Sequence, residues 1–591
     1  MNRARGGLFP HLRPLGRYLN RYRRDVAFGY LMMLGKSAGI LTIPWLVRTG
    51  IDRVGEGAPS RELLTLSLWM LAASVAAGVF MYGMRWTLIG MSRRIEYDLR
   101  NDFFAQLISL SPSFFHRHRT GDLMARATND LNAVRDVVGP GLMYALNTFT
   151  LVVASVVLML QIDPILTLAV LAPFPVMATL VAYFSGEVHR RSLAVQDEYG
   201  RLQNAAQENL AGIRVVQANV QEAAETIHFT ERSRLYRESN VALIRYRALF
   251  YATVAAVVGV DSLVLLWVGG ARVISGALTI GGLVAFMAYL SQLTWPFIAT
   301  GWVVSLLQRG EAAMQRILEV FQARPEITDG ETVLSREAVR GAIRWEDVSY
   351  RYADGPWVLR HVSFEIPAGA TVAVVGRTAA GKSTLAQLLP RLVDPDEGRI
   401  LLDGHDLRAL RTADLRRAVT IVPQEGFLFS DTLAENIRFG RPDVSDADVE
   451  AAARLAGLWT DIDSFPHGLE TRVGERGITV SGGQRQRTAL ARALLMDAPV
   501  LVLDDALASV DKETEARLWA DLRRVRFGRT TLVITHRAST AREADQIVVL
   551  EQGSILEHGS PDELLALGGA FADMSRRQEL TEQLEAVDVG D

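Results

Sequence analysis

The fold of the second half of the chain is decided by one stretch, Gly376-Arg377-Thr378-Ala379-Ala380-Gly381-Lys382-Ser383-Thr384. This stretch matches the phosphate-binding pattern G-x-x-x-x-G-K-[ST]. The apolar run Thr371–Val375 precedes it, and the helix-forming run Leu385–Leu389 follows it. A buried strand, a glycine-containing loop and a helix in this order predict an α/β domain, in which N–H groups of the loop surround phosphates at the helix start.

The side chains of this loop indicate which ligand it takes. Lys382 is expected to reach the terminal phosphates of a nucleotide, and the hydroxyl of Ser383 is expected to ligate Mg²⁺. Ala379 and Ala380 stand where glycine or serine is more usual, so we expect a small adjustment of the loop backbone. The sequence therefore predicts a site for ATP and Mg²⁺.

Two carboxylates follow a second buried strand. The apolar run Val500–Leu503 ends in Asp504 and Asp505. An acidic residue at the end of a strand beside a phosphate-binding loop can hold Mg²⁺, which is the role expected of Asp504. The carboxylate of Asp505 is then placed to polarise the attacking water. Two aspartates after a strand are weak evidence alone, but together with the loop they predict a nucleotide-hydrolysing site.

A second phosphate-binding helix start lies upstream of that strand. Ser481, Gly482, Gly483 and Gln484 open a long helix that runs through Leu494. A serine hydroxyl and glycine N–H groups at a helix start suit a phosphate. One nucleotide does not need two such cradles from one chain. We therefore expect two chains to pack head to tail, each closing its second cradle over nucleotide bound by the other.

The composition limits the classes of protein that this chain can belong to. It has 591 residues, 49% hydrophobic and 22% charged, which is too long for one domain and too apolar for a disordered chain. The net charge of −3 gives no sign of a nucleic-acid partner. The lack of cysteine excludes disulfides, thiolate catalysis and cysteine-ligated zinc. The first 25 residues are basic and interrupted, so no cleavable signal peptide is predicted.

The first half of the chain contains six apolar stretches long enough to cross a membrane, which takes about 20 residues. They are approximately Val26–Val47, Leu63–Ile89, Gly139–Gln161, Ile165–Ser185, Leu249–Gly270 and Gly282–Leu306. Short and long links alternate between them. The long links, 90–138 and 186–248, carry charged residues at helical spacing and little glycine or proline, so the helices are expected to continue far into water.

Arginine residues indicate how these spans are oriented. The segment before the first span and both long links are rich in arginine, whereas the short links carry few. Positive charge favours the cytoplasmic side, so both termini and both long links are expected there, in a multi-pass protein of the inner (cytoplasmic) membrane. Residues 9–22 suit an interfacial helix. Lys36 and Asp261 lie within the spans, where each would line a polar cavity, form a pair or reach an interface.

Taken together, these features resemble a half-transporter of the ATP-binding cassette (ABC) exporter family, with six spans fused before one nucleotide-binding domain. The resemblance covers nearly the whole chain, and the family's motifs occur in order. Those not yet mentioned are Tyr352 in the adenine-stacking position, Gln424 in the Q-loop position, Thr471–Gly477, Asp511 in the D-loop and His536 in the switch position. The resemblance implies that Gln424 also contacts Mg²⁺, that Gln424 and His536 act in catalysis with Asp505, and that 481–484 is the signature motif acting on the partner's ATP.

The chain departs from the family pattern at residue 505. Members that hydrolyse ATP well usually have glutamate directly after the Mg²⁺ aspartate, where this chain has Asp505. The missing methylene withdraws the carboxylate by about 1.5 Å, and a misplacement of about 1 Å can cost about 10²-fold in rate. We expect this site to bind Mg·ATP and hydrolyse it slowly. The resemblance then implies a heterodimer whose second, related chain supplies the glutamate; a homodimer working slowly with aspartate is the alternative.

Each long link contains one interruption of its helical pattern. The first lies at Ser113–Gly121, near Phe114 and Phe115, and the second begins at Gly212, Ile213 and Arg214. The resemblance implies that these are coupling segments that dock on nucleotide-binding domains, the second one on that of the partner. The alternative is that each is merely the tip of a helical hairpin.

The predicted fold is a membrane α-helical bundle of six transmembrane helices with long cytoplasmic extensions, joined to an α/β P-loop ATPase domain. Expected boundaries are 1–25 for an interfacial segment, 26–322 for the membrane domain, 323–577 for the nucleotide-binding domain and 578–591 for a tail. The leading hypothesis is an ATP-driven exporter subunit, embedded in the lipid bilayer, that moves amphipathic drugs, lipids or peptides out of the cytoplasm. A homodimeric lipid flippase and an ATP-gated channel or sensor are the alternatives.

Overall fold

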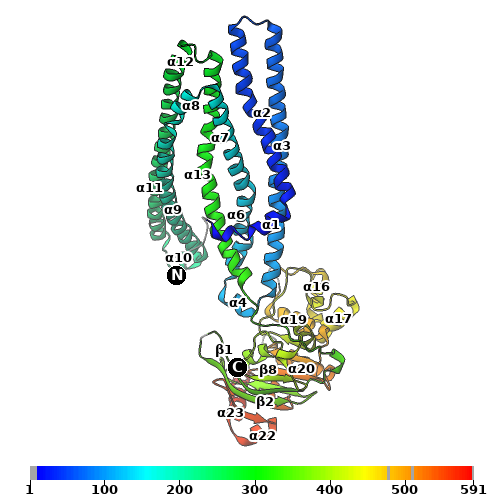
Figure 1. The fold of residues 1–591 in the computed structure, drawn as a ribbon. Helices are drawn as coiled ribbons and strands as arrows, with labels where there is room; N and C mark the ends of the chain where they lie inside the picture. Colours follow the sequence, from blue (N-terminus) through cyan, green and yellow to red (C-terminus); the bar gives the residue numbers. More distant parts are fainter. Residues whose placement is uncertain (1–8, 354, 475–479, 508–511, 589–591) are drawn as a thin grey trace. The chain divides into compact units, whose positions relative to one another are not determined.

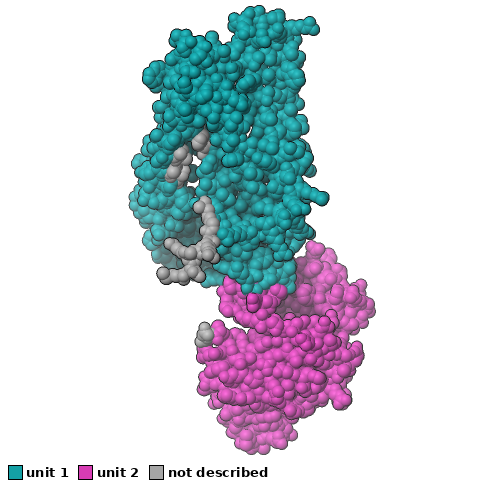
Figure 2. All heavy atoms as spheres, in the orientation of Figure 1, with its two compact units in different colours: residues 1–108, 119–323 teal, residues 109–118, 324–591 magenta. Residues whose placement is uncertain are grey.

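The computed structural model describes residues 9–353, 355–474, 480–507 and 512–588. The chain divides into two compact units, which Figure 2 shows in different colours. The first comprises the chain up to Ile108 together with Arg119–Ala323, and the second comprises Ser109–His118 together with Arg324 onward. The segment 109–118 therefore packs with the second unit although the chain on either side of it belongs to the first.

The described residues of the first unit form helices joined by short links (Figure 1). These are η1 (Pro10–Leu12), α1 (Leu15–Arg21), α2 (Arg23–Gly55), α3 (Ser60–Ser109), α5 (Thr120–Ala125), η2 (Arg126–Asp130), α6 (Leu131–Asp136), η3 (Val137–Gly141), α7 (Leu142–Ile162), α8 (Pro164–Leu171), α9 (Phe174–Ala211), α10 (Ile213–Ala218), α11 (Glu222–Val264), η4 (Leu265–Gly269), α12 (Gly270–Ile274) and α13 (Ile280–Gln322). Because η2, η3 and η4 are π-helical turns, the helical chain continues through them.

Among the described residues, four helical stretches are long and apolar enough to cross a membrane: Arg23–Gly55, Ser60–Ser109, Thr120–Ile162 and Glu222–Ile274. Over the residues whose side chains are described, two shorter apolar stretches occupy Pro164–Met177, across the junction of α8 and α9, and Ile280–Leu293, at the start of α13. A membrane-spanning helical domain is therefore confirmed, while the number of six spans stays a prediction. The fourth predicted span is interrupted between α8 and α9, since Pro173 and Pro175 lack the N–H groups that a continuous helix requires.

Polar contacts tie the short links of the bundle together. Asp163, 2% exposed, accepts the N–H groups of Ile165 and Leu166 at 3.0 Å and so caps α8. The same carboxylate pairs with Arg272 at the end of α12. Near the end of α2, Asp52 accepts the N–H of Gly281 at 2.9 Å. These contacts fix where the paired helices turn.

The long links are helical over most of their length, as the charge pattern predicted. The helices α9 and α11 run side by side well beyond their apolar parts (Figure 1). Each long link is interrupted once by a short helix: α4 (Pro112–Arg117) in the first and α10 in the second.

The second unit is an α/β domain with two sheets. Its strands are β1 (Ile343–Arg351), β2 (Trp357–Ile366), β3 (Thr371–Val375), β4 (Glu397–Leu402), β5 (His405–Asp406), β6 (Val419–Val422), β7 (Val500–Asp504), β8 (Thr530–Ile534), β9 (Gln546–Glu551) and β10 (Ser554–Gly559). The first sheet is antiparallel with the order β2-β1-β4-β5, and the second has the order β10-β9-β3-β8-β7-β6.

Besides α4, the described helices of this unit are η5 (Arg336–Ala338), α14 (Lys382–Leu388), η6 (Leu407–Ala409), α15 (Thr412–Ala418), α16 (Leu433–Arg438), α17 (Asp446–Leu455), α18 (Trp459–Ile462), η7 (Gly468–Glu470), α19 (Gly482–Met496), α20 (Lys512–Val525), α21 (Ala538–Arg542), α22 (Pro561–Leu567) and α23 (Ala570–Asp588). The last of these extends to Asp588, into the segment 578–591 that was predicted to be a separate tail.

The second sheet positions the site. Its strands β9, β3, β8, β7 and β6 are parallel, so their carboxyl ends meet at one edge. In this type of sheet, ligands bind outside the carboxyl ends of the strands. Buried side chains on β3, β7 and β8 form the core beneath that edge. Gly376 follows β3, His536 follows β8 and Gln424 follows β6. Residues far apart in sequence are thereby brought to the same edge.

Candidate active site

The loop after β3 requires glycine at its two ends. A Cβ on Gly376 would lie 2.1 Å from the carbonyl oxygen of Leu550. Gly381 has a φ of +99°, and a Cβ there would lie 2.8 Å from the carbonyl oxygen of Val358. Ala379 also has a positive φ, +66°, which an L-residue adopts only at a cost of about 1–2 kcal/mol. The alanine at this position is therefore accommodated with backbone strain.

Lys382, at the start of α14, folds back over this loop. Its Nζ donates hydrogen bonds to the carbonyl oxygens of Gly376 at 2.8 Å and Arg377 at 3.0 Å. Burial lowers the pKa of Lys382 below its usual range, while the carboxylates of Asp505 and Asp504 oppose that effect. An ammonium group held over the loop by neutral carbonyls can be transferred to phosphate oxygens, which carry full charges.

Ser383 and Asp504 lie together as the sequence predicts for a Mg²⁺ site. The hydroxyl of Ser383 donates to Oδ1 of Asp504 at 3.0 Å. Burial raises the pKa of the Asp504 carboxyl, and the neighbouring Asp505 raises it further. A buried carboxyl beside a hydroxyl is an oxygen donor set that suits Mg²⁺, whose charge would favour ionised Asp504. The residues present therefore fit this ion.

Asp505 and His536 are in direct contact. Nδ1 of His536 lies 2.9 Å from Oδ1 and 3.1 Å from Oδ2 of Asp505. The backbone of Asp505 has a φ of +50°, and its N–H donates to the carbonyl oxygen of Ile534 at 2.9 Å. The backbone of Asp505 is thus fixed against β8, and its short side chain is held by the imidazole of the loop after β8.

Gln424 lies just after β6, with its backbone tied to the same site. Its carbonyl oxygen accepts a hydrogen bond from Nε2 of Gln486 at 3.0 Å, and the same nitrogen lies 3.4 Å from the carbonyl oxygen of Asp505. Gln486 is buried on α19, the helix that the signature motif opens. Sequence reasoning missed Gln486, because a polar residue inside a helix gives no sign of the two loops that it joins.

Gln578, on α23, is a second residue that sequence reasoning missed. Its Nε2 donates to the carbonyl oxygen of His536 at 2.6 Å, and its Oε1 accepts the N–H of Ala538 at 2.6 Å. The loop that carries His536 is thus held on both sides by one amide side chain. Residue 578 falls at the start of the segment 578–591 that the sequence predicted to be a tail, and nothing in the local pattern distinguishes it from a surface glutamine.

Tyr352 follows the end of β1 and stands beside the phosphate-binding loop. Its hydroxyl lies 3.1 Å from Oγ1 of Thr384, and its side chain remains 40% exposed. A cavity of about 420 Å³ lies next to it and is lined by Tyr352, Gln387 and Ser111, among others. An exposed aromatic ring at the loop is the arrangement that adenine stacking needs, and that role stays a prediction.

The signature residues form a helix start on the surface of the same unit. Oγ of Ser481 accepts the N–H of Gln484 at 3.2 Å, and Oε1 of Gln484 accepts the N–H of Ser481 at 2.9 Å. This reciprocal capping box fixes the first turn of α19, including Gly482 and Gly483. Ser481 and Gly482 are exposed. Residues 475–477 and Asp511 lie outside the described residues.

The predicted coupling segments lie in different units. In the second unit, Phe114 stacks on His118 at 4.1 Å between ring centroids, next to Phe115. Oγ of Ser111 accepts the N–H of Glu326 at 3.1 Å, which ties this segment to the start of the nucleotide-binding region.

The other segment, Gly212, Ile213 and Arg214, lies at the junction of α9 and α10 in the first unit. Ile213 and Val215 are exposed there.

The two charged residues predicted to lie within the spans, Lys36 and Asp261, have different surroundings. Nζ of Lys36 on α2 donates to Oδ1 of Asn147 on α7 at 2.7 Å, so Lys36 joins two helices. Asp261 on α11 is buried, and its Oδ1 has no hydrogen-bond partner among the described residues.

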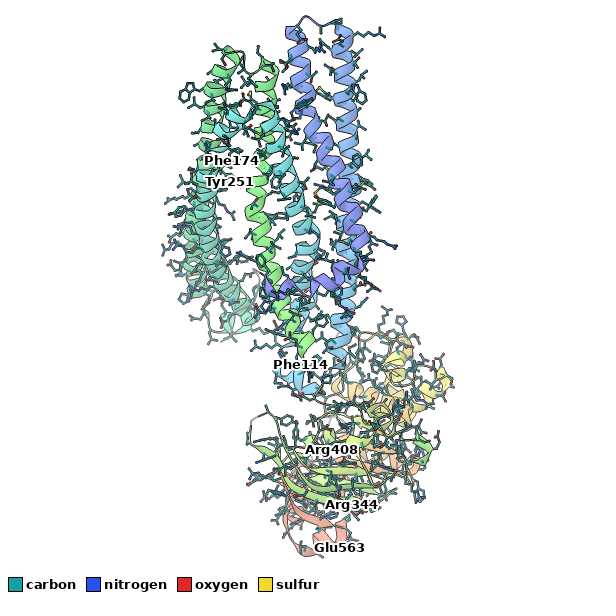
Figure 3. The ribbon with its side chains drawn as sticks, in the orientation of Figure 1. Phe114, Phe174, Tyr251, Arg344, Arg408 and Glu563 are labelled. Atoms are coloured by element: carbon teal, nitrogen blue, oxygen red, sulfur yellow. The ribbon has the colours of Figure 1, made fainter. Side chains whose placement is uncertain are left out.

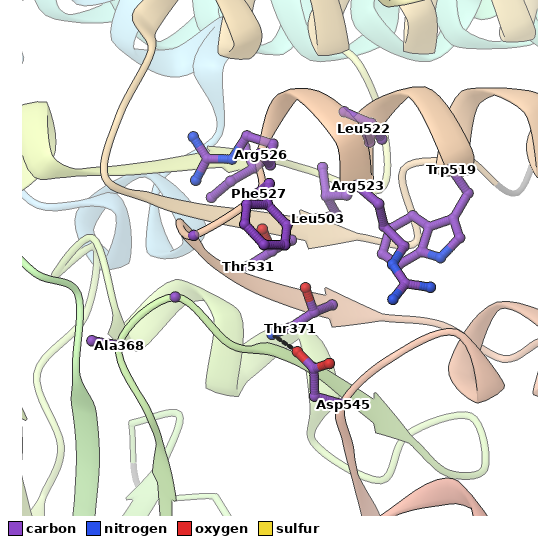
Figure 4. Close-up of a pocket in the computed structure, with 13 residues that line it drawn as sticks. Ala368, Thr371, Leu503, Trp519, Leu522, Arg523, Arg526, Phe527, Thr531 and Asp545 are labelled. Atoms are coloured by element: carbon purple, nitrogen blue, oxygen red, sulfur yellow. Dashed lines mark hydrogen bonds between the residues drawn. The ribbon is translucent and has the colours of Figure 1, made fainter.

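A separate cavity of about 330 Å³ lies at the opposite edge of the second sheet (Figure 4). It is lined by Thr371 at the start of β3, by Trp519 and by Asp545, whose Oδ2 accepts the N–H of Thr371 at 2.8 Å. Thr371 lies at the start of β3 and the phosphate-binding loop follows the end of the same strand, so this cavity does not belong to the nucleotide site.

Comparisons with known proteins agree with this geometry. Family models described as the ABC transporter transmembrane region and ABC transporter match residues 26–297 and 359–508. The chain is 34% identical over 577 residues to a probable multidrug resistance ABC transporter ATP-binding/permease protein, YheI of Bacillus subtilis, covering 97% of this chain and 98% of the relative. It is 35% identical to an ATP-dependent lipid A-core flippase of Chromohalobacter salexigens, covering 87% and 89% of the two chains.

A solved structure is similar over nearly the whole chain. A bacterial Atm1-family ABC exporter with ATP bound aligns with a TM-score of 0.79 and 30% identity, covering 94% of this chain and 98% of that one. The membrane helices, the nucleotide site and these relatives lead to one conclusion. The chain belongs to the ABC transporter family, as an exporter half-transporter whose ATPase domain couples ATP hydrolysis to transport.

Proposed function

We propose that this chain is one half of an ATP-driven exporter of amphipathic molecules, and that its own ATP site hydrolyses slowly. It would work with a second, related chain, whose active site it completes. The observation that carries the proposal is Asp505, a short carboxylate held by His536 where a longer side chain is usual in active family members.

The proposed binding roles follow from the positions of the side chains. The loop 376–384 surrounds the phosphates, Lys382 moves from its carbonyl partners to phosphate oxygens, and Tyr352 stacks on the adenine. Ser383, Asp504 and Gln424 would hold Mg²⁺. When bound, this ion supplies charge that stabilises the phosphoryl group during transfer.

The proposed slow step is activation of the attacking water by Asp505. A general base must lie within hydrogen-bond reach of the proton that it takes, directly or through one water. The Asp505 backbone is fixed by its bond to Ile534, and both carboxylate oxygens face one imidazole nitrogen. The Asp505 carboxylate would have to leave His536, or the Asp505 backbone would have to leave Ile534, to come closer to the attacking water. His536 would hold the carboxylate in place without restoring its reach.

The proposed heterodimer rests on the signature helix. Ser481–Gln484 is a complete helix start whose first two residues, Ser481 and Gly482, are exposed, and it would complete the site of a partner chain. If that partner has glutamate after its Mg²⁺ aspartate, the shared site that uses this chain's signature would be the active one. A homodimer would place the short carboxylate in both sites and would turn over slowly.

The proposed coupling path uses both interruptions of the long helices. The segment with Phe114 already packs with the nucleotide-binding unit through Ser111 and Glu326, which supports a role in transmitting its movement. The exposed apolar residues Ile213 and Val215 suit docking on the partner chain. Closing and opening of the nucleotide sandwich would reach the membrane helices through these two points.

The substrate class is proposed from the membrane domain and the relatives. One relative is named as a multidrug resistance protein, and another as a lipid A-core flippase. An amphipathic substrate that enters from the bilayer would be compatible with both names. The flippase relative specifically favours a lipid as the second candidate.

Reconstituted vesicles can test this function. With ATP outside and the nucleotide-binding domain facing outward, the complex of this chain and its partner should accumulate an amphipathic dye or a labelled lipid against a gradient. Lys382→Ala in this chain, combined with the equivalent lysine-to-alanine change in the partner chain, should abolish accumulation. Passive flux in either direction after ATP binding, without hydrolysis, would instead identify an ATP-gated channel and refute the proposal.

A further inference from the structure

A cavity of about 360 Å³ lies within the first unit, between α9, α11 with its π-turn η4, and α13. Its walls are mainly apolar and include Phe174 and Met177 from α9, Leu265 from η4, and Leu283 and Met287 from α13. Phe174 is labelled in Figure 3. A cavity of this size can take the apolar part of a small amphipathic molecule.

Among the described residues that line this cavity, Asp261 alone is ionisable. The residue is 7% exposed, and its Oδ1 has no hydrogen-bond partner among the described residues. The hydroxyl of neighbouring Ser262 does not serve it, because Oγ of Ser262 donates to the carbonyl oxygen of Val258 at 2.9 Å. The cavity thus combines a mainly apolar wall with one buried carboxyl oxygen that has no hydrogen-bond partner in the described part of the chain.

A carboxyl without a hydrogen-bond partner is unusual at the position that Asp261 has along the predicted membrane span. It lies nine residues before Gly270, the end of the predicted span, or about 14 Å along a helix. That distance is about half of the roughly 30 Å hydrocarbon layer. A carboxylate at such a depth is costly unless a cation or a proton accompanies it. The π-turn η4, which begins at Leu265, is a helix irregularity of the kind often found at functional sites.

We propose that this cavity binds the cationic group of an amphipathic molecule, with Asp261 as the counter-ion. The apolar part of the ligand would contact Phe174 and the flexible thioethers of Met177 and Met287. An aromatic face attracts a cation, and methionine adapts to ligands of different shape. The inference rests on the proposed function, since it names lipophilic cations as a substrate class of the exporter.

Equilibrium binding to the full-length chain in lipid nanodiscs, without nucleotide, tests the site. Tetraphenylphosphonium serves as the cationic probe and tetraphenylborate as the anion of nearly equal size, each corrected for binding to empty nanodiscs. The wild-type chain should bind the cation and should show no net binding of the anion. Asp261→Asn should weaken cation binding at least about tenfold, whereas Asp261→Glu should keep most of it.

Ser262→Ala is the matched control, because it removes a hydroxyl from the same cavity without changing its charge. It should bind the cation as the wild type does. Asp261→Asn should also keep its thermal unfolding midpoint and its ATP affinity, so that a loss of binding is not a loss of fold. Equal cation binding by wild type and Asp261→Asn, or equal binding of cation and anion, would overturn the proposal.

The binding experiment on the cation site and the transport experiment on the proposed exporter function can fail independently of each other. ATP-driven export of a lipid without cation binding at Asp261 would refute the cation site alone. Cation binding that depends on Asp261, without any ATP-driven transport, would leave the site standing and refute the exporter function.

Discussion

Gln578 of α23 donates a hydrogen bond at 2.6 Å to the carbonyl oxygen of His536, in the loop that faces Asp505. The same side chain accepts the N–H of Ala538 at 2.6 Å. The position of the switch histidine thus depends on a helix near the carboxyl terminus, far from it in sequence.

Gln578→Ala should therefore slow ATP hydrolysis without weakening ATP binding. The loop loses two hydrogen bonds, and misplacement of His536 by a fraction of an ångström should lower kcat about three- to tenfold. The measurement is steady-state turnover in the Asp505→Glu background, where the rate is expected to be high enough to follow. Arg576→Ala, an exposed change on the same helix, is the control. An unchanged kcat in Gln578→Ala would show that this contact does not position the loop.

The buried carboxyl of Asp504 should make stability without Mg²⁺ depend on pH. Burial raises the pKa of Asp504, so the folded chain holds this proton more tightly than the unfolded chain does. Stability should consequently fall as pH rises from the ordinary range of an aspartate through the raised value. Asp504→Asn removes this dependence and should raise the thermal midpoint relative to wild type more at pH 8 than at pH 5.

Addition of Mg²⁺ and ATP should reverse the order of the two thermal midpoints, because the ion favours ionised Asp504 and the Asp504→Asn variant has no carboxylate to ionise. It should raise the midpoint of the wild type and have a smaller effect on Asp504→Asn. The same difference between the two proteins at both pH values would contradict the assignment of a raised pKa.

Gly381→Ala should disrupt the phosphate-binding loop through a steric clash as well as backbone strain. The new Cβ would lie 2.8 Å from both the Val358 carbonyl oxygen and Cδ2 of Leu359, at a φ of +99°. Gly404→Ala is the matched control, because its φ is +84° but no atom lies within 4 Å of the new Cβ. We expect the control to lose about 1–2 kcal/mol of stability and keep ATP binding. Gly381→Ala should lose ATP binding; normal affinity would show that the loop relaxes.

The predicted orientation can be tested by cysteine labelling, since the natural chain contains no cysteine. Ala58→Cys lies in the first short link, and Glu222→Cys lies at the start of α11 in the second long link. A membrane-impermeant maleimide should label Ala58→Cys in intact spheroplasts and Glu222→Cys only in inside-out vesicles. Labelling of both residues from the same side would contradict the arrangement of spans.

Much of this site could be predicted because its chemistry is carried by short, contiguous patterns. The loop 376–384 and the strands before Gly376 and Asp504 occur as expected, and β3 has the predicted bounds Thr371–Val375. Parallel pairing then brings Asp504 to Ser383, a contact that the motif spacing already implied.

The rest depends on contacts between residues without a local pattern. Gln486 and Gln578 look like ordinary helix glutamines, and only the tertiary fold directs their amides to backbone carbonyls of the site. The break between α8 and α9 was missed for a different reason. The apolar run across Pro173 has the composition of a continuous span, and hydropathy does not register the loss of backbone N–H groups.

The most direct test of the central claim is steady-state ATP turnover by the purified chain and its Asp505→Glu variant, with Asp443→Glu as the same change at an exposed site. If the short carboxylate limits hydrolysis, the wild type and the control should turn over slowly, and Asp505→Glu should be at least about tenfold faster. Brisk turnover by the wild type, with no gain in Asp505→Glu, would contradict the account.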